Sequence, residues 1–242
     1  MLTTKWTRAA AAVLAVGLAL VARAEDRPNG SFGPIRSRMQ AYVDQSEIAG
    51  AVTVVGRHDA VLDITAVGTA DLETRRPMTK DAIFRIASMT KPVTAIGIML
   101  LVDEGKVSVE ERVEKYLPEF RGQMLVASRD KSAGTETLKK PAKPITIRDL
   151  LTHTSGLPNW PAGLSDVYRK RNHTLAEGIL AISQRPLEFE PGSKWAYCNT
   201  GIDTLGRIIE VVSGQSYEDF LRTRIFEPLG MTDTTFYPTP VQ

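Results

Sequence analysis

Alternating β-branched residues dominate the first regular part of the chain. Residues 51–69 form two apolar runs on either side of residues 56–60, a pattern that predicts a β-hairpin. Before the hairpin, residues 35–43 place apolar side chains at helical spacing and predict a short helix. Residues 89–104 are apolar with little polar face, so we expect a buried helix that ends at Gly105.

The second half of the chain has mainly helical patterns. Residues 127–144 are polar and basic, and we interpret them as a surface loop. Thr146 followed by Asp149 resembles a capping box and predicts a short helix that Gly156 ends. Residues 201–213 carry apolar side chains at helical spacing and are followed by a capping glycine. The pattern therefore predicts a small sheet followed by a helical region.

The composition is that of an ordinary globular chain. Its 242 residues are 43% hydrophobic and 24% charged, which excludes a disordered protein. Cys198 is the one cysteine, so a disulfide scaffold is excluded. The three histidines, His58, His153 and His173, are scattered, and we interpret each as a surface or capping residue rather than a metal ligand. A phosphate-binding loop and a dinucleotide fingerprint are absent, so we expect no cofactor and no metal.

Residues 1–24 have the pattern of a secretory signal peptide. Two basic residues precede the uncharged run 9–22, and Ala22-Arg23-Ala24 supplies a cleavage site. The run is shorter than the ~20 residues that a membrane-spanning helix needs, although an uncleaved anchor remains the alternative. We therefore expect a periplasmic or secreted protein with no stable membrane anchor after cleavage.

Cleavage after Ala24 would also change the charge. It would remove three of the 30 basic residues (Lys5, Arg8 and Arg23) and none of the 28 acidic ones, so the formal charge would go from +2 to −1. Nothing in the remaining chain indicates a nucleic-acid partner.

Ser88 and Lys91 are the first candidate catalytic residues. Their three-residue spacing at the start of a helix places them on one face. A serine hydroxyl needs an adjacent base, and a lysine amine can take its proton when burial keeps the amine neutral. Pro92 fits the first turn, which places Ser88 at the helix N-terminus. The same spacing at Ser128 and Lys131 is interpreted as accidental, and a capping serine beside a solvated lysine is the alternative for the first pair.

Tyr197 and Asn199 form the second candidate element. They follow the turn-forming residues 191–192 and precede the amphipathic segment. A phenol near Lys91 can relay a proton to a leaving group, and the Asn199 amide can hold a substrate carbonyl or the lysine. A half-buried aromatic side chain beside Trp195 is the alternative interpretation of Tyr197.

Four segments in this order resemble the serine β-lactamase and penicillin-binding-protein superfamily, and most of all the class C β-lactamases and their esterase relatives. The segments are Phe84–Lys91 with Leu101–Val107, Ile145–Leu157, Tyr197-x-Asn199 with its following helix, and Phe226–Met231. The resemblance implies an α+β, β-lactamase/transpeptidase-like fold: an antiparallel sheet flanked by helices, plus an all-helical subdomain. It further implies a nucleophile at Ser88, a base at Lys91, an acid/base at Tyr197, and an acyl-enzyme hydrolysed by water without a metal. Cys198 stands where family members often carry serine, and we expect it to be a small residue packed in the wall of the site.

The family's third motif, Lys-Thr-Gly or His-x-Gly on an edge strand, is absent from residues 200–242. In the family that strand donates one of two oxyanion-hole N–H groups, and losing one such donor costs roughly 10²–10³ in rate. We therefore expect residues 25–242 to form a β-lactamase-related serine hydrolase domain that lacks its C-terminal strands and third motif.

Three functions fit these observations. The favoured one is an exported serine hydrolase that cleaves small-molecule esters, with β-lactams less favoured, through an acyl-Ser88 intermediate. The second is a D-alanyl-D-alanine carboxypeptidase or transpeptidase acting on cell-wall peptides. The third is a truncated, non-catalytic relic or binding module of the same fold. The sequence makes no prediction of oligomeric state.

Overall fold

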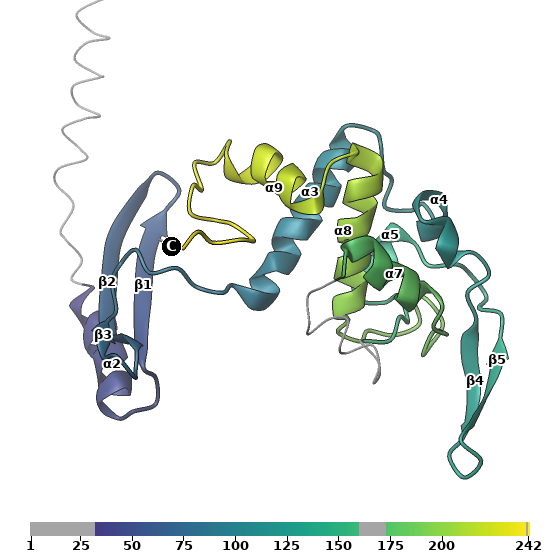
Figure 1. Ribbon diagram of the computed structural model, residues 1–242, viewed down its shortest axis with the longest axis horizontal. Coiled ribbons are helices and arrows are strands. Elements are labelled where there is room, and N and C mark those ends of the chain that lie inside the picture. Colours follow the sequence, from purple (N-terminus) through teal and green to yellow (C-terminus); the bar gives the residue numbers. More distant parts are fainter. Residues whose placement is uncertain (1–31, 160–172, 241) are drawn as a thin grey trace, which may run out of the picture. The chain divides into compact units, whose positions relative to one another are not determined.

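The computed structural model describes residues 32–159, 173–240 and 242, so the predicted signal peptide lies outside the described residues. The chain divides into two units, one that ends at Phe84 and one that begins at Arg85 (Figure 1). Among the described residues, the first unit holds a sheet and one helix, and the second holds the other helices together with a separate hairpin. The α+β class predicted from the sequence is confirmed.

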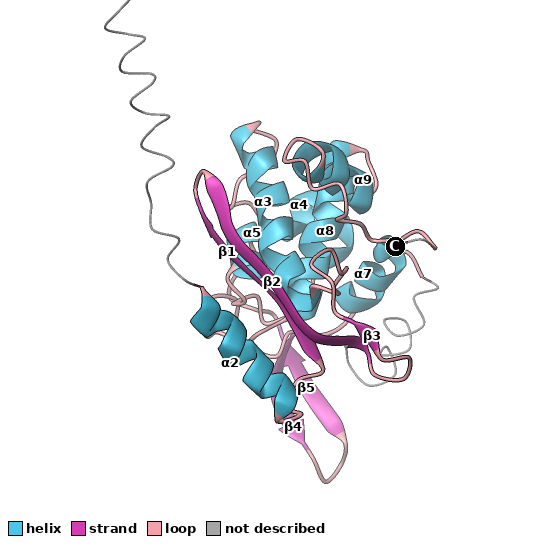
Figure 2. Ribbon diagram, turned by 90° about the vertical axis from the view of Figure 1, so that its left-hand side faces the viewer, coloured by secondary structure: helices cyan, strands magenta, loops and turns pink. Residues whose placement is uncertain are grey.

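The first unit is an antiparallel sheet with a helix packed on it. Its elements are α2 (Gly33–Asp44), β1 (Gly50–Arg57), β2 (Ala60–Asp71) and β3 (Arg76–Pro77), with the strands in the order β1-β2-β3. The predicted hairpin and the predicted helix before it are both confirmed. Figure 2 shows α2 running beside the sheet, with which it is in contact.

The second unit is arranged around α8. Its helices are α3 (Thr90–Asp103), α4 (Val113–Tyr116), α5 (Ile147–Leu151), α7 (Leu175–Ser183), α8 (Asn199–Ser213) and α9 (Tyr217–Leu221), with 3-10 turns at Ala87–Met89 and Pro118–Phe120 and a π-helical turn at Arg222–Phe226. The helix α8 contacts α3, α4, α5, α7 and α9. Its buried apolar face includes Leu205, Ile208 and Ile209, each 0% exposed. Burial of such a side chain stabilises the fold by ~1.5–3 kcal/mol relative to leaving it exposed.

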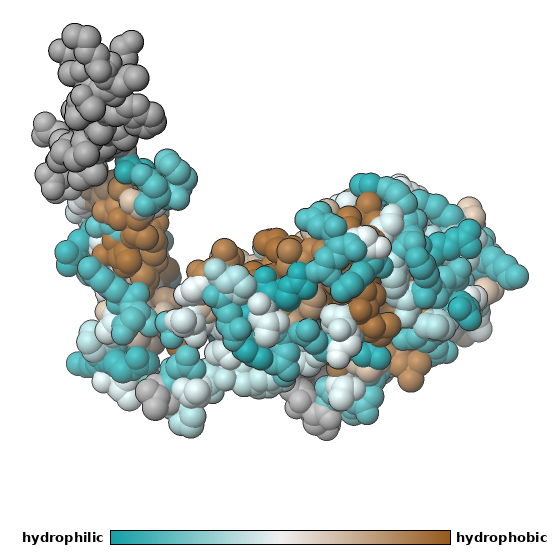
Figure 3. All heavy atoms as spheres, turned by 90° about the horizontal axis from the view of Figure 1, so that it is seen from above, coloured by the Kyte–Doolittle hydropathy of each residue, from teal (hydrophilic) through white to brown (hydrophobic). Residues whose placement is uncertain are grey.

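The helix α3 packs on α8 through one side only. Gly97 allows the close approach, because a Cβ atom there would lie 2.9 Å from Cδ1 of Ile209. On other sides of the helix, Ile96 is 50% and Met99 43% exposed, so the expectation of a helix buried all round is wrong. Apolar side chains reach the surface of both units (Figure 3).

A capping box starts α5, as predicted. The Thr146 hydroxyl accepts a hydrogen bond from the Asp149 N–H at 3.2 Å, and the Asp149 carboxylate accepts one from the Thr146 N–H at 3.0 Å. The predicted end of this helix at Gly156 is wrong. The helix ends at Leu151, because His153 takes a left-handed conformation with a φ of 58°.

A hairpin occupies residues 125–139, which include much of the segment 127–144 that the polar, basic pattern predicted to be a surface loop. The strands β4 (Leu125–Asp130) and β5 (Thr135–Lys139) are antiparallel and project from the helices (Figure 1). Arg129 pairs with Glu136 across the strands at 2.7 Å, and the Asp130 carboxylate accepts hydrogen bonds from backbone N–H groups of the turn. Most residues of both strands are exposed, so no apolar alternation marks them in the sequence. The second unit therefore holds a β-hairpin as well as its helices.

Candidate active site

Ser88 and Lys91 lie where a 3-10 turn runs into α3. Nζ of Lys91 is 3.1 Å from Oγ of Ser88, so the two side chains share one face of the helix start, as the spacing predicts. Pro92 is in the first turn of α3, where its missing N–H costs no hydrogen bond. The hydroxyl is exposed and open to a substrate, while the lysine is half-buried.

Tyr197 approaches the same point from a different part of the chain. Its phenol oxygen is 2.6 Å from Oγ of Ser88, and Nζ of Lys91 lies 4.7 Å from the centroid of its ring. Hydrogen bonding to Lys91, and then to Ser88, lowers the pKa of the Tyr197 phenol from its ordinary value. The structure thus brings all three predicted catalytic side chains together.

Asn199, the fourth predicted site residue, is the first residue of α8. Its backbone N–H donates to the side chain of Asn159 at 2.8 Å. Within the described part of the chain, no hydrogen bond joins its own side-chain amide to Ser88, Lys91 or Tyr197. A substrate-binding role for Asn199 stays a prediction.

His153 lies beside the site, next to Tyr197, although the sequence predicted a surface or capping residue. Its ring is half-buried, with its centroid 4.9 Å from that of Tyr197 and 6.1 Å from that of Trp195. Burial, and then the positive charge of Lys91, lowers the pKa of the His153 imidazole. The neutral ring is therefore favoured at this position.

Cys198 is packed inside the wall of the site, as expected. It is 2% exposed, and its thiol donates to the carbonyl oxygen of Leu157 at 3.3 Å. Burial raises the pKa of the Cys198 thiol, which disfavours the reactive thiolate.

The second Ser-x-x-Lys match has a different setting. Ser128 lies on β4 and Lys131 in the turn that follows, and both side chains are exposed. Since no buried helix supports this lysine, the interpretation of the match as accidental agrees with its position on the hairpin.

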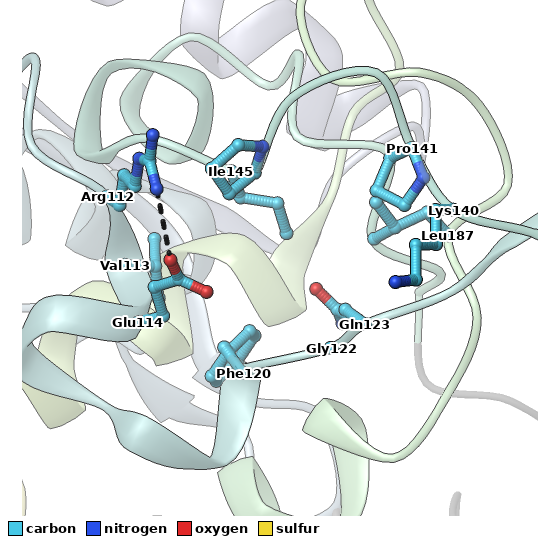
Figure 4. A pocket seen from close by; sticks show the side chains of 11 residues that line it. Arg112, Val113, Glu114, Phe120, Gly122, Gln123, Lys140, Pro141, Ile145 and Leu187 are labelled. Atoms are coloured by element: carbon cyan, nitrogen blue, oxygen red, sulfur yellow. Dashed lines mark ion pairs between the residues drawn. The ribbon is translucent and has the colours of Figure 1, made fainter.

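A separate pocket of about 230 Å³ lies between α4 and the segments on either side of β4 and β5. Val113, Phe120 and Leu187 line it together with an ion pair at 3.5 Å between Arg112 and Glu114 (Figure 4). It shares no residue with the site around Ser88. Among the residues that the structure describes, no group of three or more His, Cys, Asp or Glu side chains is placed to hold a metal ion, and none of the helices is long and apolar enough to cross a membrane.

Comparisons with known proteins identify the family of the chain. The family model described as Beta-lactamase matches residues 35–242. Esterase EstB of Burkholderia gladioli is 36% identical over an alignment of 216 positions, which covers 84% of this chain and 52% of the esterase. Among solved structures, EstCE1, a hydrolase with promiscuous acyltransferase activity, is matched with a TM-score of 0.71 and 30% identity over 86% of this chain and 53% of EstCE1. The octameric penicillin-binding protein homologue from Pyrococcus abyssi is matched with a TM-score of 0.68 and 30% identity over 87% of this chain and 46% of the homologue.

The chain therefore belongs to the serine β-lactamase and penicillin-binding-protein superfamily. The resemblance seen in the sequence is confirmed, and so is the β-lactamase/transpeptidase-like fold. The chain spans about half the length of the relatives that it matches.

Proposed function

We propose that the protein is a serine hydrolase that cleaves carboxylic esters of small molecules through an acyl-Ser88 intermediate. The observation that carries the proposal is the convergence of Lys91 Nζ and the Tyr197 phenol on one hydroxyl, at 3.1 Å and 2.6 Å. A serine with two proton-transfer groups in hydrogen-bond reach has the geometry of an activated nucleophile.

The first half of the proposed reaction forms the acyl-enzyme. Oγ of Ser88 attacks the ester carbonyl carbon while its proton passes to Lys91, which acts as the base in its unprotonated form. When the bond between the acyl carbon and the alcohol oxygen breaks, the Tyr197 phenol gives its proton to the leaving alcohol. Lys91 then returns its proton to the phenolate, which completes the transfer.

The second half releases the acid. A water molecule attacks the carbonyl carbon of acyl-Ser88 and loses a proton to Lys91 or to the Tyr197 phenolate. The bond to Oγ breaks, the carboxylic acid leaves, and Oγ regains a proton. The lowered pKa of Tyr197 supports its role in proton transfer, because the phenolate forms more readily there than in an ordinary tyrosine. Asn199 is proposed to contact the substrate from the start of α8.

Esters are favoured over other acyl substrates because the chain resembles Esterase EstB. The likeness to a penicillin-binding protein homologue supports a second candidate, the hydrolysis of D-alanyl-D-alanine peptides by the same three side chains. Export to the periplasm or the medium, with residues 1–24 removed, is also part of the proposal and rests on the sequence pattern alone.

Turnover by the 242-residue chain tests the proposal. Three substrates are offered in parallel: p-nitrophenyl butyrate, a chromogenic cephalosporin and diacetyl-Lys-D-Ala-D-Ala. We expect ester cleavage to exceed cleavage of the other two and to fall by at least ~10³-fold in Ser88→Ala. Ser128→Ala is the matched control and keeps the parent rate. Release of D-alanine in preference to ester cleavage would favour the second candidate, and a folded chain that cleaves none of the three would support a non-catalytic relic.

A further inference from the structure

His153, from a distant part of the chain, makes hydrogen bonds to the backbone of the segment that carries Tyr197. The carbonyl oxygen of His153 accepts a hydrogen bond from the Ala196 N–H at 2.9 Å. Its Nδ1 accepts a second from the Cys198 N–H at 3.2 Å. One residue therefore binds the backbone on both sides of the tyrosine.

Asn159 completes the attachment with its side-chain amide. Nδ2 donates to the Tyr197 carbonyl oxygen at 2.8 Å, and Oδ1 accepts from the Asn199 N–H at 2.8 Å. The Asn159 amide thus pairs with the chain as a backbone peptide group would, donating to the Tyr197 carbonyl and accepting from the Asn199 N–H. Together, the two residues hold one backbone group of each residue from 196 to 199.

The ring of Tyr197 needs such support. Tyr197 is 41% exposed, and an exposed tyrosine can adopt several staggered χ1 rotamers. The His153 ring lies against the phenol ring at an interplanar angle of 34°, and Trp195 meets the imidazole edge-on at 82°. The imidazole therefore fixes both the backbone and one face of the ring.

We propose that His153 and Asn159 are positioning residues that hold the Tyr197 phenol against Ser88 and Lys91. The inference rests on the proposed function for its kinetic consequences, but the placement of the phenol can be measured without turnover. It assigns a role to His153, which the proposed hydrolytic mechanism does not use.

The two roles of His153 can be separated by substitution. His153→Asn places an amide oxygen close to the position of Nδ1 and tolerates the left-handed backbone, so it keeps the acceptor without the ring. His153→Phe keeps the ring without the acceptor. Asn159→Ala removes both bonds of the amide, and His173→Asn makes the same exchange as the first variant at a remote position.

Two readouts are taken on each folded variant. In the first, kcat and KM are measured for ester hydrolysis. We expect kcat to fall about 10–100-fold in His153→Phe and Asn159→Ala with KM nearly unchanged, because misplacement of a reacting group by ~1 Å can cost about 100-fold. His153→Asn should recover most of the loss, and His173→Asn should equal the parent.

The second readout is the pKa of Tyr197, followed by NMR of the ¹³Cζ-labelled phenol and assigned with Tyr197→Phe. Loss of the contacts made by His153 or Asn159 should raise this pKa towards the ordinary tyrosine value, because the phenol moves away from Lys91. The parent could be inactive and still have a lowered Tyr197 pKa that returns to the ordinary value in His153→Phe and Asn159→Ala. That result would contradict the hydrolase proposal but support this inference. Unchanged pKa and kcat in folded His153→Phe and Asn159→Ala would overturn the inference. If His153→Phe fails to fold, Asn159→Ala decides the question alone.

Discussion

The hydroxyl oxygen of Ser88 and the phenol oxygen of Tyr197 are 2.6 Å apart, although 109 positions separate the two residues in the chain. Ser88 is placed by the turn before α3 and Tyr197 by the segment before α8, and these two helices pack directly on each other. The contact between the helices therefore fixes the distance on which the proposed proton transfer depends. This contact between the helices is made by the buried face of α8 and by Gly97 of α3, which faces Ile209.

The charge of Lys91 should control the ionisation of Tyr197. Hydrogen bonding to Lys91 is the largest cause of the lowered Tyr197 pKa. Replacement by an uncharged side chain in Lys91→Met should therefore raise the Tyr197 pKa, measured by NMR titration of the labelled phenol. Lys194→Met, which removes a lysine three positions before Tyr197 in sequence, serves as the control and should leave the titration unchanged. An identical titration in Lys91→Met and the parent would contradict the assigned contact.

Stability should depend on the protonation of His153. Its folded-state pKa is lowered by burial and by Lys91, so below pH ~6.5 the unfolded chain binds a proton more readily than the folded chain does. The free energy of unfolding should then fall as the pH drops from ~6.5 through the lowered folded-state value. The charged or titratable groups facing the imidazole are Lys91 and the Tyr197 phenol.

Denaturant unfolding of the parent and His153→Asn across this range checks the expectation. The variant should show a weaker loss of stability on acidification, because it has no imidazole to protonate. His173→Asn should follow the parent curve. Parallel curves for the parent and His153→Asn would show that protonation of His153 is not linked to folding.

The sequence predicted the elements whose physics is local. The apolar run of α3, the amphipathic face of α8 and the Thr146–Asp149 capping box all depend on neighbours within a few positions. The convergence of Ser88, Lys91 and Tyr197 agreed with expectation because the family resemblance supplied the long-range link. No short-range pattern could have supplied it.

What the sequence missed has a physical reason. Asn159 and His153 act on backbone atoms 38 to 45 positions away, and a backbone N–H or carbonyl leaves no mark in the sequence. The left-handed φ of His153 also has no sequence pattern that predicts it. The hairpin of β4 and β5 is held by charged pairs such as Arg129 with Glu136 rather than by an apolar face, so its strands have the composition of a loop.

Gly156 should be irreplaceable in the loop that follows α5. Its φ is 78°, and an added Cβ atom would lie 2.2 Å from the carbonyl oxygen of Phe189. We expect Gly156→Ala to reduce the free energy of unfolding by about 2–4 kcal/mol, since left-handed strain and a displaced backbone add together. Gly105→Ala is the matched control. Its φ is 68° with no atom within 4 Å of the added Cβ, so the cost should be the ~1–2 kcal/mol of conformational strain alone. Equal costs in thermal or denaturant unfolding would contradict the assigned clash.

Export can be tested on the N-terminus itself. If residues 1–24 are a signal peptide, protein recovered from the periplasm or medium of an expressing bacterium should begin at Glu25, as seen by intact mass. Ala24→Phe should block cleavage, because the processing site needs a small residue there. Full-length protein in the membrane fraction of the parent would instead indicate an uncleaved anchor.

The central claim is that Ser88 is an activated nucleophile, and covalent labelling tests it most directly. The 242-residue chain is exposed to a serine-reactive fluorophosphonate and its intact mass is measured, beside Ser88→Ala and Ser128→Ala and with circular dichroism of each. We predict one added label in the parent and in Ser128→Ala, and none in folded Ser88→Ala. A folded parent that takes no label, or a label that persists in Ser88→Ala, would contradict the account.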